Sequence, residues 1–109
     1  MAMKELKQEE FDDFIRKNRI AVIDFWAPWC MPCLALSPVL EELENEFDGV
    51  AFAKVNVDRN VDLARQFGIM SIPTIIIFVN GKEADRIIGL VPKEELRERI
   101  LTYSGSFSP

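Results

Sequence analysis

The residues best suited to covalent chemistry are the two cysteines, Cys30 and Cys33, which are the only thiols in the chain. The stretch that contains them, FWAPWCMPC, also holds both tryptophans. Cys30 follows a short apolar run typical of a buried strand and precedes a segment with helical spacing, so we expect it to open a helix. The unpaired N–H groups and the positive dipole end at such a position stabilise a thiolate, which makes Cys30 a candidate nucleophile near neutral pH.

Cys33 comes one helical turn after Cys30 and lies on the same helix face. This spacing lets its thiol attack a mixed disulfide formed at Cys30, which closes a small internal disulfide and releases a reduced partner. Pro32 lacks an N–H and has a fixed φ, so it tightens the first turn without wasting a donor. The pattern therefore predicts thiol–disulfide exchange, for which Cys-x-x-Cys beside βαβ patterning is a known signature.

Three other roles for the pair remain open at this point. A structural zinc site usually needs four ligands, and the chain has no histidine, so carboxylates would have to complete it. A metal cluster shared between two chains would need cysteines from both. The two cysteines could also be inert core residues, which free cysteines often are.

Composition limits the classes of protein that the chain can belong to. Its 109 residues are 49% hydrophobic and 28% charged, which predicts one soluble globular domain over residues 1–109. The net charge of −5 argues against nucleic acid as a partner, because binding phosphate requires a basic surface.

Cysteine usage and the N-terminal residues suggest where the protein works. Two cysteines are too few for a secreted disulfide framework, and the charged start MAMKELK contains no apolar signal segment. The apolar run Ile75–Val79 is far too short to span a bilayer. We therefore expect a cytoplasmic protein that does not associate with membranes.

Hydrophobic periodicity and turn residues predict a series of short elements. Asn80-Gly81 is a two-residue hairpin signal, Gly68 is placed to end a helix, and Pro38 should kink the helix that contains it. The expected helices are 8–18, 34–47, 60–67 and a last one with Pro92 in its first turn; the expected strands are 20–26, 50–57, 74–79 and 83–88, with a short outer strand at 3–6 and a flexible tail at 104–109.

The order of these elements predicts an α/β fold. Strand 20–26 is almost continuously apolar, which is typical of a strand buried on both faces. Helical crossovers between the first strands predict parallel pairing, and the hairpin adds an antiparallel edge. We expect a central mixed β-sheet flanked by helices on both faces.

Several separate motifs give the chain a resemblance to the thioredoxin family. Val22–Cys33 resembles that family's active-site segment, and Ile72-Pro73-Thr74 resembles its cis-proline loop. Lys54–Asp58, Phe78–Gly81 and Gly89 fit the family pattern in order and spacing. The resemblance covers nearly the whole chain, about residues 5–103, and implies a thioredoxin fold.

The resemblance also implies roles for four catalytic residues. Cys30 would be the attacking thiol and Cys33 the resolving one, while Asp24 would be a buried carboxylate that exchanges protons with Cys33. Asp24 interrupts an apolar strand, and a buried charge is costly without a partner or a task; the alternative is an exposed strand end. Lys54 would face Asp24 and tune its charge state, and the alternative is an ordinary surface lysine.

A second group of residues would bind the substrate. The resemblance implies that the loop Ile72-Pro73 lies against the cysteines, and Pro73 is a candidate for a cis peptide bond. Its neighbouring backbone groups would pair with an extended substrate segment. Trp29 and Gly89 would complete the contact patch, together with Met31 and Pro32 at its mouth. Trp29 could instead be an ordinary surface aromatic residue, and Gly89 an ordinary turn glycine.

The sequence departs from the family pattern at three places around the cysteines. Met31 stands where the family usually has glycine, and Leu34 stands where it often has lysine. Both changes make the rim of the site more apolar, and the loss of lysine removes a positive charge that would stabilise the thiolate. Met70-Ser71 also differs from the usual pair before Ile-Pro.

These features predict a protein-disulfide reductase of the thioredoxin type. The resemblance implies recharging by a thioredoxin reductase, disulfide-containing protein substrates, a monomeric state, and no cofactor or metal besides the redox-active Cys30–Cys33 pair. Two rival functions are an oxidant or isomerase with the same fold and a non-enzymatic docking subunit. The intact cysteine pair, Asp24 and Ile72-Pro73 favour the reductase.

Overall fold

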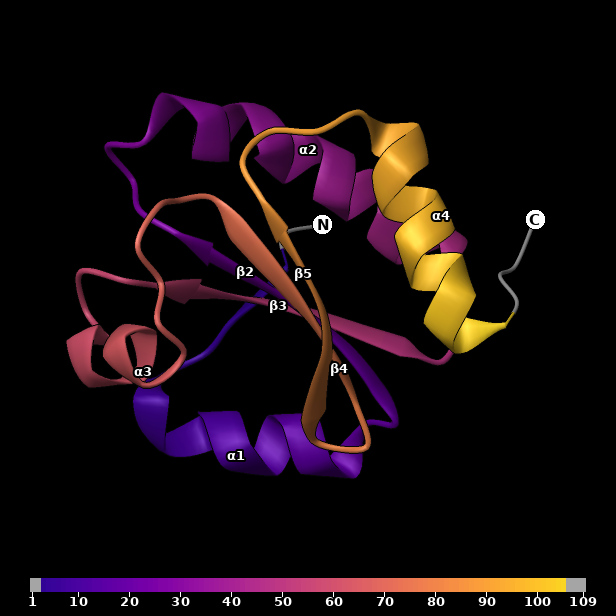
Figure 1. The fold of residues 1–109 in the computed structure, drawn as a ribbon, viewed down its shortest axis with the longest axis horizontal. Coiled ribbons are helices and arrows are strands. Elements are labelled where there is room, and N and C mark those ends of the chain that lie inside the picture. Colours follow the sequence, from indigo (N-terminus) through magenta and orange to yellow (C-terminus); the bar gives the residue numbers. More distant parts are fainter. Residues whose placement is uncertain (1–2, 106–109) are drawn as a thin grey trace.

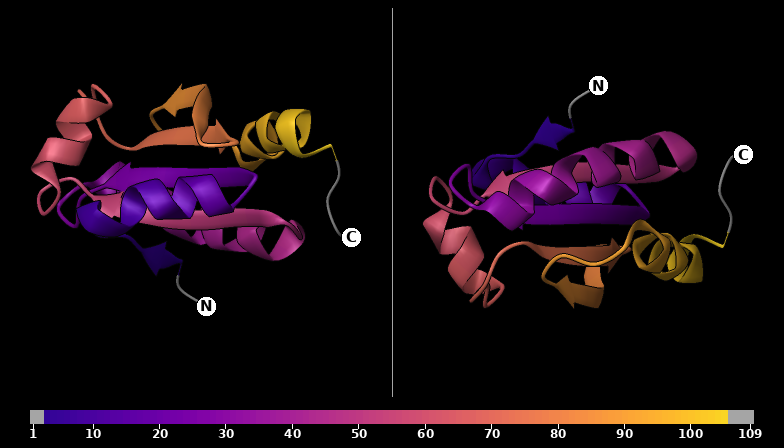
Figure 2. Two further views of the ribbon diagram at one scale, coloured as in Figure 1. Left: turned by 90° about the horizontal axis from the view of Figure 1, so that it is seen from below. Right: turned by 90° about the horizontal axis from the view of Figure 1, so that it is seen from above.

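The computed structural model describes residues 3–105, which form a five-stranded mixed sheet with helices on both faces (Figure 1). The strand order is β1-β3-β2-β4-β5, so β2 lies at the centre. The sheet seen along its edge in Figure 2 has β1 at one margin and β5 at the other. The elements are β1 Lys4–Glu5, α1 Gln8–Lys17, β2 Ile20–Trp26, α2 Met31–Glu46, β3 Val50–Asn56, α3 Val61–Gln66, β4 Thr74–Val79, β5 Lys82–Ile88 and α4 Lys93–Ser104.

The central strand β2 is buried on both faces, as its continuous apolar run predicts. Alternate residues of the sheet point to two separate cores. One core packs α2 and α4 against residues such as Val22 and Ile77, and the other packs α1 and α3 against residues such as Ile23 and Phe78. Helices thus cover both faces of the sheet, which confirms the predicted α/β class.

The direction of β4 differs from a simple crossover pattern. β2 pairs in parallel with β3, as predicted, but β4 is antiparallel to β2 as well as to its hairpin partner β5. β4 begins beside the carboxyl end of β2, where Thr74 pairs with Phe25. The chain therefore enters β4 at the same end of the sheet at which it left β3.

Several predicted boundaries shift by a few residues. α2 begins at Met31 rather than at residue 34, and it runs as one helix through Pro38, although the kink expected there stays a prediction. Pro92 is the N-cap of α4 rather than a residue of its first turn, because its extended ψ of 150° lies outside the helical region. The short outer strand is present as β1, which pairs in parallel with β3. Residues 106–109 of the expected tail lie outside the described part of the chain.

The hairpin between β4 and β5 forms at the predicted turn. Asn80 and Gly81 both have positive φ, at 53° and 81°, which is the backbone geometry of the Asn-Gly hairpin turn. Among residues 3–105, no helix combines the length and the apolar character needed to cross a bilayer.

Charged residues tie the start of α4 to the end of α2. Glu46 on α2 accepts hydrogen bonds from Arg97 at 2.8 and 3.0 Å, and Lys93 lies 3.0 Å away. The Arg97 hydrogen bonds, together with Lys93, lower the pKa of Glu46 to about 2. Because Lys93 is the first residue of α4, this contact also holds the preceding segment 89–92 near α2.

An aromatic cluster between α1 and the sheet provides a test of the second core. The ring of Phe11 lies 5.3 Å from Phe67, 5.6 Å from Phe78 and 6.4 Å from Phe25, measured between centroids. Phe11→Ala should lower the free energy of unfolding by about 3–5 kcal/mol, because it leaves a cavity among these rings. Denaturant unfolding measures this loss, and Phe11→Leu should lose clearly less. A loss for Phe11→Ala below about 1 kcal/mol would contradict the packing described here.

Candidate functional site

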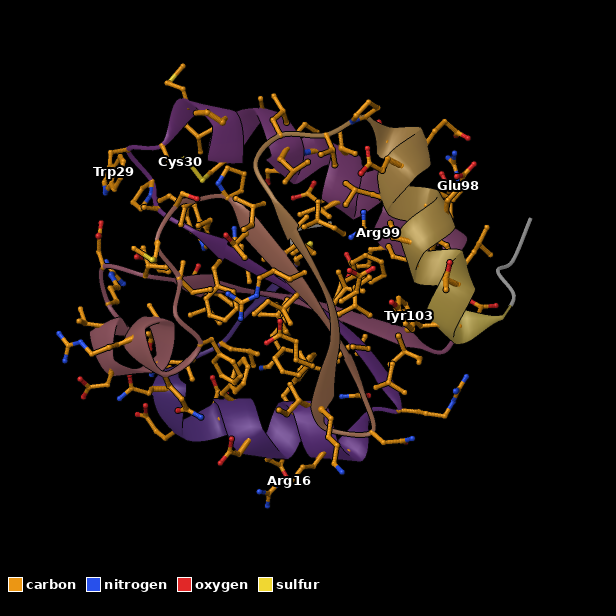
Figure 3. All side chains as sticks on the ribbon, in the orientation of Figure 1. Arg16, Trp29, Cys30, Glu98, Arg99 and Tyr103 are labelled. Atoms are coloured by element: carbon orange, nitrogen blue, oxygen red, sulfur yellow. A yellow bond between two sulfur atoms is a disulfide. The ribbon has the colours of Figure 1, made fainter. Side chains whose placement is uncertain are left out.

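The two cysteines lie at the N-terminus of α2 and are joined in a disulfide. Cys30 is the N-cap residue, Pro32 is the second residue of the helix, and Cys33 closes the first turn. The Cα atoms of the cysteines are 5.2 Å apart. Their exposure differs: Cys30 retains 5% and Cys33 only 1%. Figure 3 shows Cys30 beside Trp29 at one corner of the molecule, away from Arg99 and Tyr103 on α4.

The sulfur of Cys30 is held by backbone groups from two segments. The N–H of Cys33 donates to Cys30 Sγ at 3.2 Å, and the carbonyl oxygen of Ile72 lies 3.8 Å from the same sulfur. α2 has 16 residues, so its dipole is fully developed at this end. After reduction, the N–H of Cys33 and the helix dipole would both stabilise a thiolate on Cys30.

The loop before β4 lies against the disulfide, as predicted. The Ile72–Pro73 peptide bond is cis. The hydroxyl of Thr74 donates to the carbonyl of Ser71 at 2.7 Å, and the N–H of Gly89 donates to the carbonyl of Pro73 at 2.8 Å. Gly89 has a φ of +90°, which favours glycine, so it is a turn residue that also borders the loop.

Asp24 is buried inside the sheet rather than exposed at a strand end. It lies on β2 opposite Lys54 of β3 and Ile75 of β4, and only 3% of it is exposed. It shares its face of the strand with Val22, which packs under α2, the helix that carries Cys33. Burial raises the pKa of Asp24 to about 7, and the positive charge of Lys54 acts in the opposite direction. Its Oδ1 atom is buried without a hydrogen-bond partner.

The amino group of Lys54 lies over the aromatic ring of Trp26, next to the site. Its Nζ lies 4.5 Å from the ring centroid of Trp26, a cation–π contact, and the side chain is half-buried. No ion pair within 4.0 Å joins Lys54 and Asp24, both of which the structure describes, so Lys54 acts on the carboxylate through its field. Trp26 in turn packs against the cluster of Ala27, Cys30 and Cys33.

Trp29 is exposed but not free to rotate. Its indole Nε1 donates to Asp58 Oδ2 at 2.8 Å, and the N–H of Asp58 donates to Asn56 Oδ1 at 2.9 Å. Asp58 belongs to one of the family motifs in the sequence, but the sequence alone assigned it no role. The position of Asp58 could have revealed this contact. Asp58 follows β3 and Trp29 follows β2, and because the two strands are parallel, both residues lie at the same end of the sheet.

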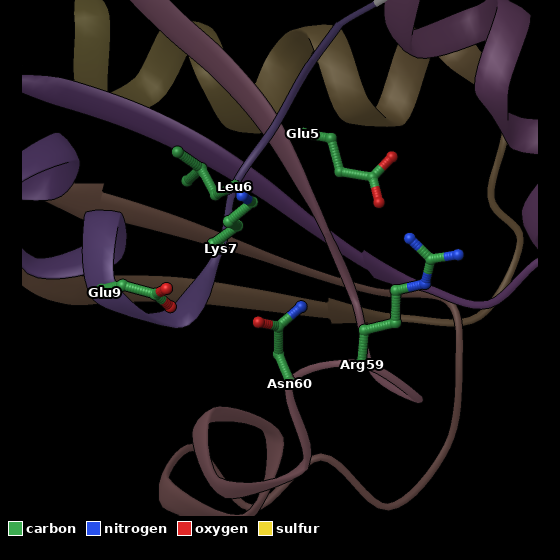
Figure 4. A pocket seen from close by; sticks show the side chains of 6 residues that line it. All are labelled: Glu5, Leu6, Lys7, Glu9, Arg59 and Asn60. Carbon is green, nitrogen blue, oxygen red and sulfur yellow. The ribbon is translucent and has the colours of Figure 1, made fainter.

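The hollows on the surface show what the site can accommodate. A shallow hollow of about 200 Å³ lies next to the disulfide and is lined by residues that include Trp29, Met70 and Ile72. A larger hollow of about 510 Å³ lies between the β1–α1 and β3–α3 turns, where Glu5 and Arg59 point towards one another (Figure 4). No cysteine lines the larger hollow. The disulfide therefore faces an open surface, which suits a polypeptide better than an enclosed small molecule.

Comparison with known proteins agrees with this geometry. The profile of the Thioredoxin family matches residues 2–102. The chain belongs to the thioredoxin family. It is 45% identical to the thioredoxin of Staphylococcus saprophyticus over 92% of this chain and 96% of that protein, and 45% identical to the thioredoxin of Chlamydia caviae over 94% and 99%. The solved structure of a mutant thioredoxin from Halobacterium salinarum superposes with a TM-score of 0.89 at 33% identity, over 99% of this chain and 95% of that one.

The family and the cysteine pair together establish the activity of this protein. It is a thiol–disulfide oxidoreductase that reduces protein disulfides, and its redox group is the Cys30–Cys33 disulfide. Because each sulfur is bonded to the other, the described state is the oxidised form of the reaction cycle.

The buried carboxyl of Asp24 predicts a specific pH dependence of stability. Its pKa is about 7 in the folded chain and near its ordinary value of 3.8 in the unfolded chain. Below about pH 4 both states hold the proton, so the group has no effect on stability. As the pH rises towards 7, only the unfolded chain releases the proton, and the free energy of unfolding should fall by roughly 4 kcal/mol before levelling off.

Asp24→Asn should remove most of this pH dependence. The measurement is denaturant unfolding of the oxidised protein between about pH 5 and about pH 8.5, where the absence of histidine leaves few other titrating groups. The disulfide keeps both thiols from titrating. Parallel pH profiles for the two proteins would show that Asp24 does not have the raised pKa.

Proposed function

We propose that this protein reduces its substrates with Cys30 as the attacking thiol and Cys33 as the resolving thiol. The observation that supports this assignment is the asymmetry of the pair. Cys30 Sγ lies at the helix N-terminus beside the Ile72 carbonyl and retains some exposure, whereas Cys33 is almost completely buried. A substrate disulfide can reach Cys30, and Cys33 can reach only Cys30.

The proposed cycle transfers two electrons and two protons to the substrate. The Cys30 thiolate attacks one substrate sulfur, which forms a mixed disulfide and expels the other substrate sulfur as a thiolate that takes up a proton. Cys33 then loses its proton and attacks Cys30 Sγ. This second step breaks the mixed disulfide, releases the second substrate thiol and closes the Cys30–Cys33 disulfide.

Asp24 is the proposed proton acceptor for Cys33. A carboxyl with a pKa of about 7 can take a proton from a thiol and release it again near neutral pH. Lys54 is the proposed tuning residue, because its charge opposes the effect of burial on Asp24.

The proposed substrate surface lies around Cys30. Backbone groups of the loop Ile72-Pro73 would pair with an extended substrate segment. Gly89, which has no side chain, would leave room for that segment beside the loop. Trp29, oriented by Asp58, would contact substrate side chains, together with Met31 and Pro32 at the start of α2.

The remaining parts of the proposal are the electron donor and the cellular location of the protein. A thioredoxin reductase would return the electrons to the Cys30–Cys33 disulfide, so the protein would need no separate cofactor or metal. We further propose that residues 1–109 act as one monomeric domain in the cytoplasm, without nucleic-acid or membrane partners.

Single cysteine variants test the two assigned roles. Cys30→Ser should abolish the reduction of insulin by dithiothreitol above the uncatalysed rate, because the attacking sulfur is gone. Cys33→Ser should form mixed disulfides that persist until external thiol is added, which non-reducing gels and mass spectrometry would detect. Normal turnover by Cys33→Ser would contradict the two-thiol mechanism.

Equilibration with glutathione separates a reductase from an oxidant or isomerase. The fraction of disulfide, measured after acid quenching and thiol alkylation, gives the reduction potential of the pair. A reductase should stay largely oxidised in a glutathione buffer that reduces strong oxidants. A strongly oxidising potential would favour the oxidant, and failure of the wild type to accelerate insulin reduction would favour a docking subunit.

A further inference from the structure

The surface around the disulfide carries no charged residue over three converging segments. Residues 27–40, 67–79 and 87–92 contain no Asp, Glu, Lys or Arg, although 28% of the chain is charged. The segments meet at the site, because Ile72 lies against Cys30 Sγ and Gly89 donates to the carbonyl of Pro73.

The same three segments also expose large apolar side chains. Met70 is 94% exposed, Met31 74% and Leu34 44%. We name the exposed apolar residues of these segments the apolar collar: Trp29, Met31, Leu34, Met70, Ile88 and Leu90. Among residues 3–105, the remaining large apolar side chain with comparable exposure is Val61, which lies on α3 outside the collar.

Two charged residues that border the site are held by aromatic partners. Asp58 accepts the indole N–H of Trp29, and Lys54 lies over the ring of Trp26. Arg59 lines the larger hollow on the other side of the β3–α3 turn. A charged side chain that a substrate placed on Met31, Leu34 or Met70 would therefore lose water beside uncharged residues, and the nearby charges of Asp58 and Lys54 are already engaged by aromatic partners.

We propose that Met31, Leu34 and Met70 determine substrate specificity and select disulfides whose cysteines are flanked by uncharged apolar residues. The partner is a polypeptide segment of that composition, such as one exposed when a protein is partly unfolded. This inference rests on the proposed reductase function and adds the substrate class. It is specific to this chain because Met31 and Leu34 replace the glycine and lysine typical of the family.

The physical basis is burial without electrostatic steering. Apolar flanking residues gain free energy when they cover the exposed methionine and leucine side chains. The collar side chains themselves carry no charge, so the reaction with a neutral apolar substrate should depend little on ionic strength.

The test uses three disulfide peptides of equal length whose flanking residues are all Leu, all Lys or all Glu. Reduced protein is mixed with each peptide, and the second-order rate constant is followed by tryptophan fluorescence at low and high salt. Each rate is divided by that for 2-hydroxyethyl disulfide, an uncharged small reagent that reports the thiol chemistry alone. The Leu peptide should react about tenfold faster than either charged peptide at high salt, as expected if two or so methylene groups are buried.

Lysine variants inside and outside the collar test whether the collar causes the preference for the Leu peptide. Leu34→Lys and Met70→Lys should each lower the normalised rate for the Leu peptide and raise that for the Glu peptide at low salt. Val61→Lys adds the same charge at an exposed apolar position outside the collar and should leave the preferences unchanged. All three side chains are exposed, so the substitutions should leave the fold intact.

The outcomes separate this proposal from the reductase function. Equal normalised rates for the three peptides, or the same shift in Val61→Lys as in Leu34→Lys, would overturn the collar while leaving the thiol chemistry established. No reaction with 2-hydroxyethyl disulfide would contradict the reductase mechanism instead. Sedimentation of the reduced protein should show a monomer; a dimer that Leu34→Lys abolishes would assign the collar to a second copy of the chain and overturn the proposal.

Discussion

The burial of β2 is the constraint on which the site depends. This strand lies between β3 and β4, and helices cover both of its faces, so each of its residues up to Phe25 is removed from water. Removal from water disfavours the charged form of Asp24, so burial raises the pKa of its carboxyl to about 7. The end of the same strand delivers the chain to Cys30 at the N-terminus of α2. One strand thus positions both the buried acid and the more exposed of the two sulfur atoms.

Backbone groups, rather than a set of charged side chains, surround the sulfur. The Cys33 N–H, the Ile72 carbonyl and the Gly89–Pro73 hydrogen bond shape the site, and their positions follow from the helix start, the loop before β4 and the end of β5. Such groups survive substitutions of neighbouring side chains. The rim residues Met31 and Leu34 can therefore differ from the glycine and lysine of the family pattern while these backbone groups keep their places around the sulfur, but the charge of the replaced lysine no longer stabilises the thiolate.

Local patterns predicted most elements because each element satisfies its own burial and turn requirements. The apolar run of β2, the Asn80-Gly81 turn and the cysteine spacing are local features, and the structure confirms them. The antiparallel direction of β4 was harder to predict, because it depends on where the segment between β3 and β4 brings the chain back to the sheet, which no local pattern of residues specifies. The contact of Lys54 with Trp26 and that of Trp29 with Asp58 also escaped prediction, since each joins side chains from different strands or loops.

The sequence by itself determined the chemistry of the protein: two thiols one helical turn apart, an acid within an apolar strand, and the absence of charge in the segments around them. These are properties of residue type and spacing, which do not change on folding. Only the tertiary structure decided which cysteine is reachable, that Asp24 is buried, and that Met31, Leu34 and Met70 stay exposed around one site. Exposure and desolvation depend on which distant segments cover a residue, and that is set by packing of the whole sheet and its helices.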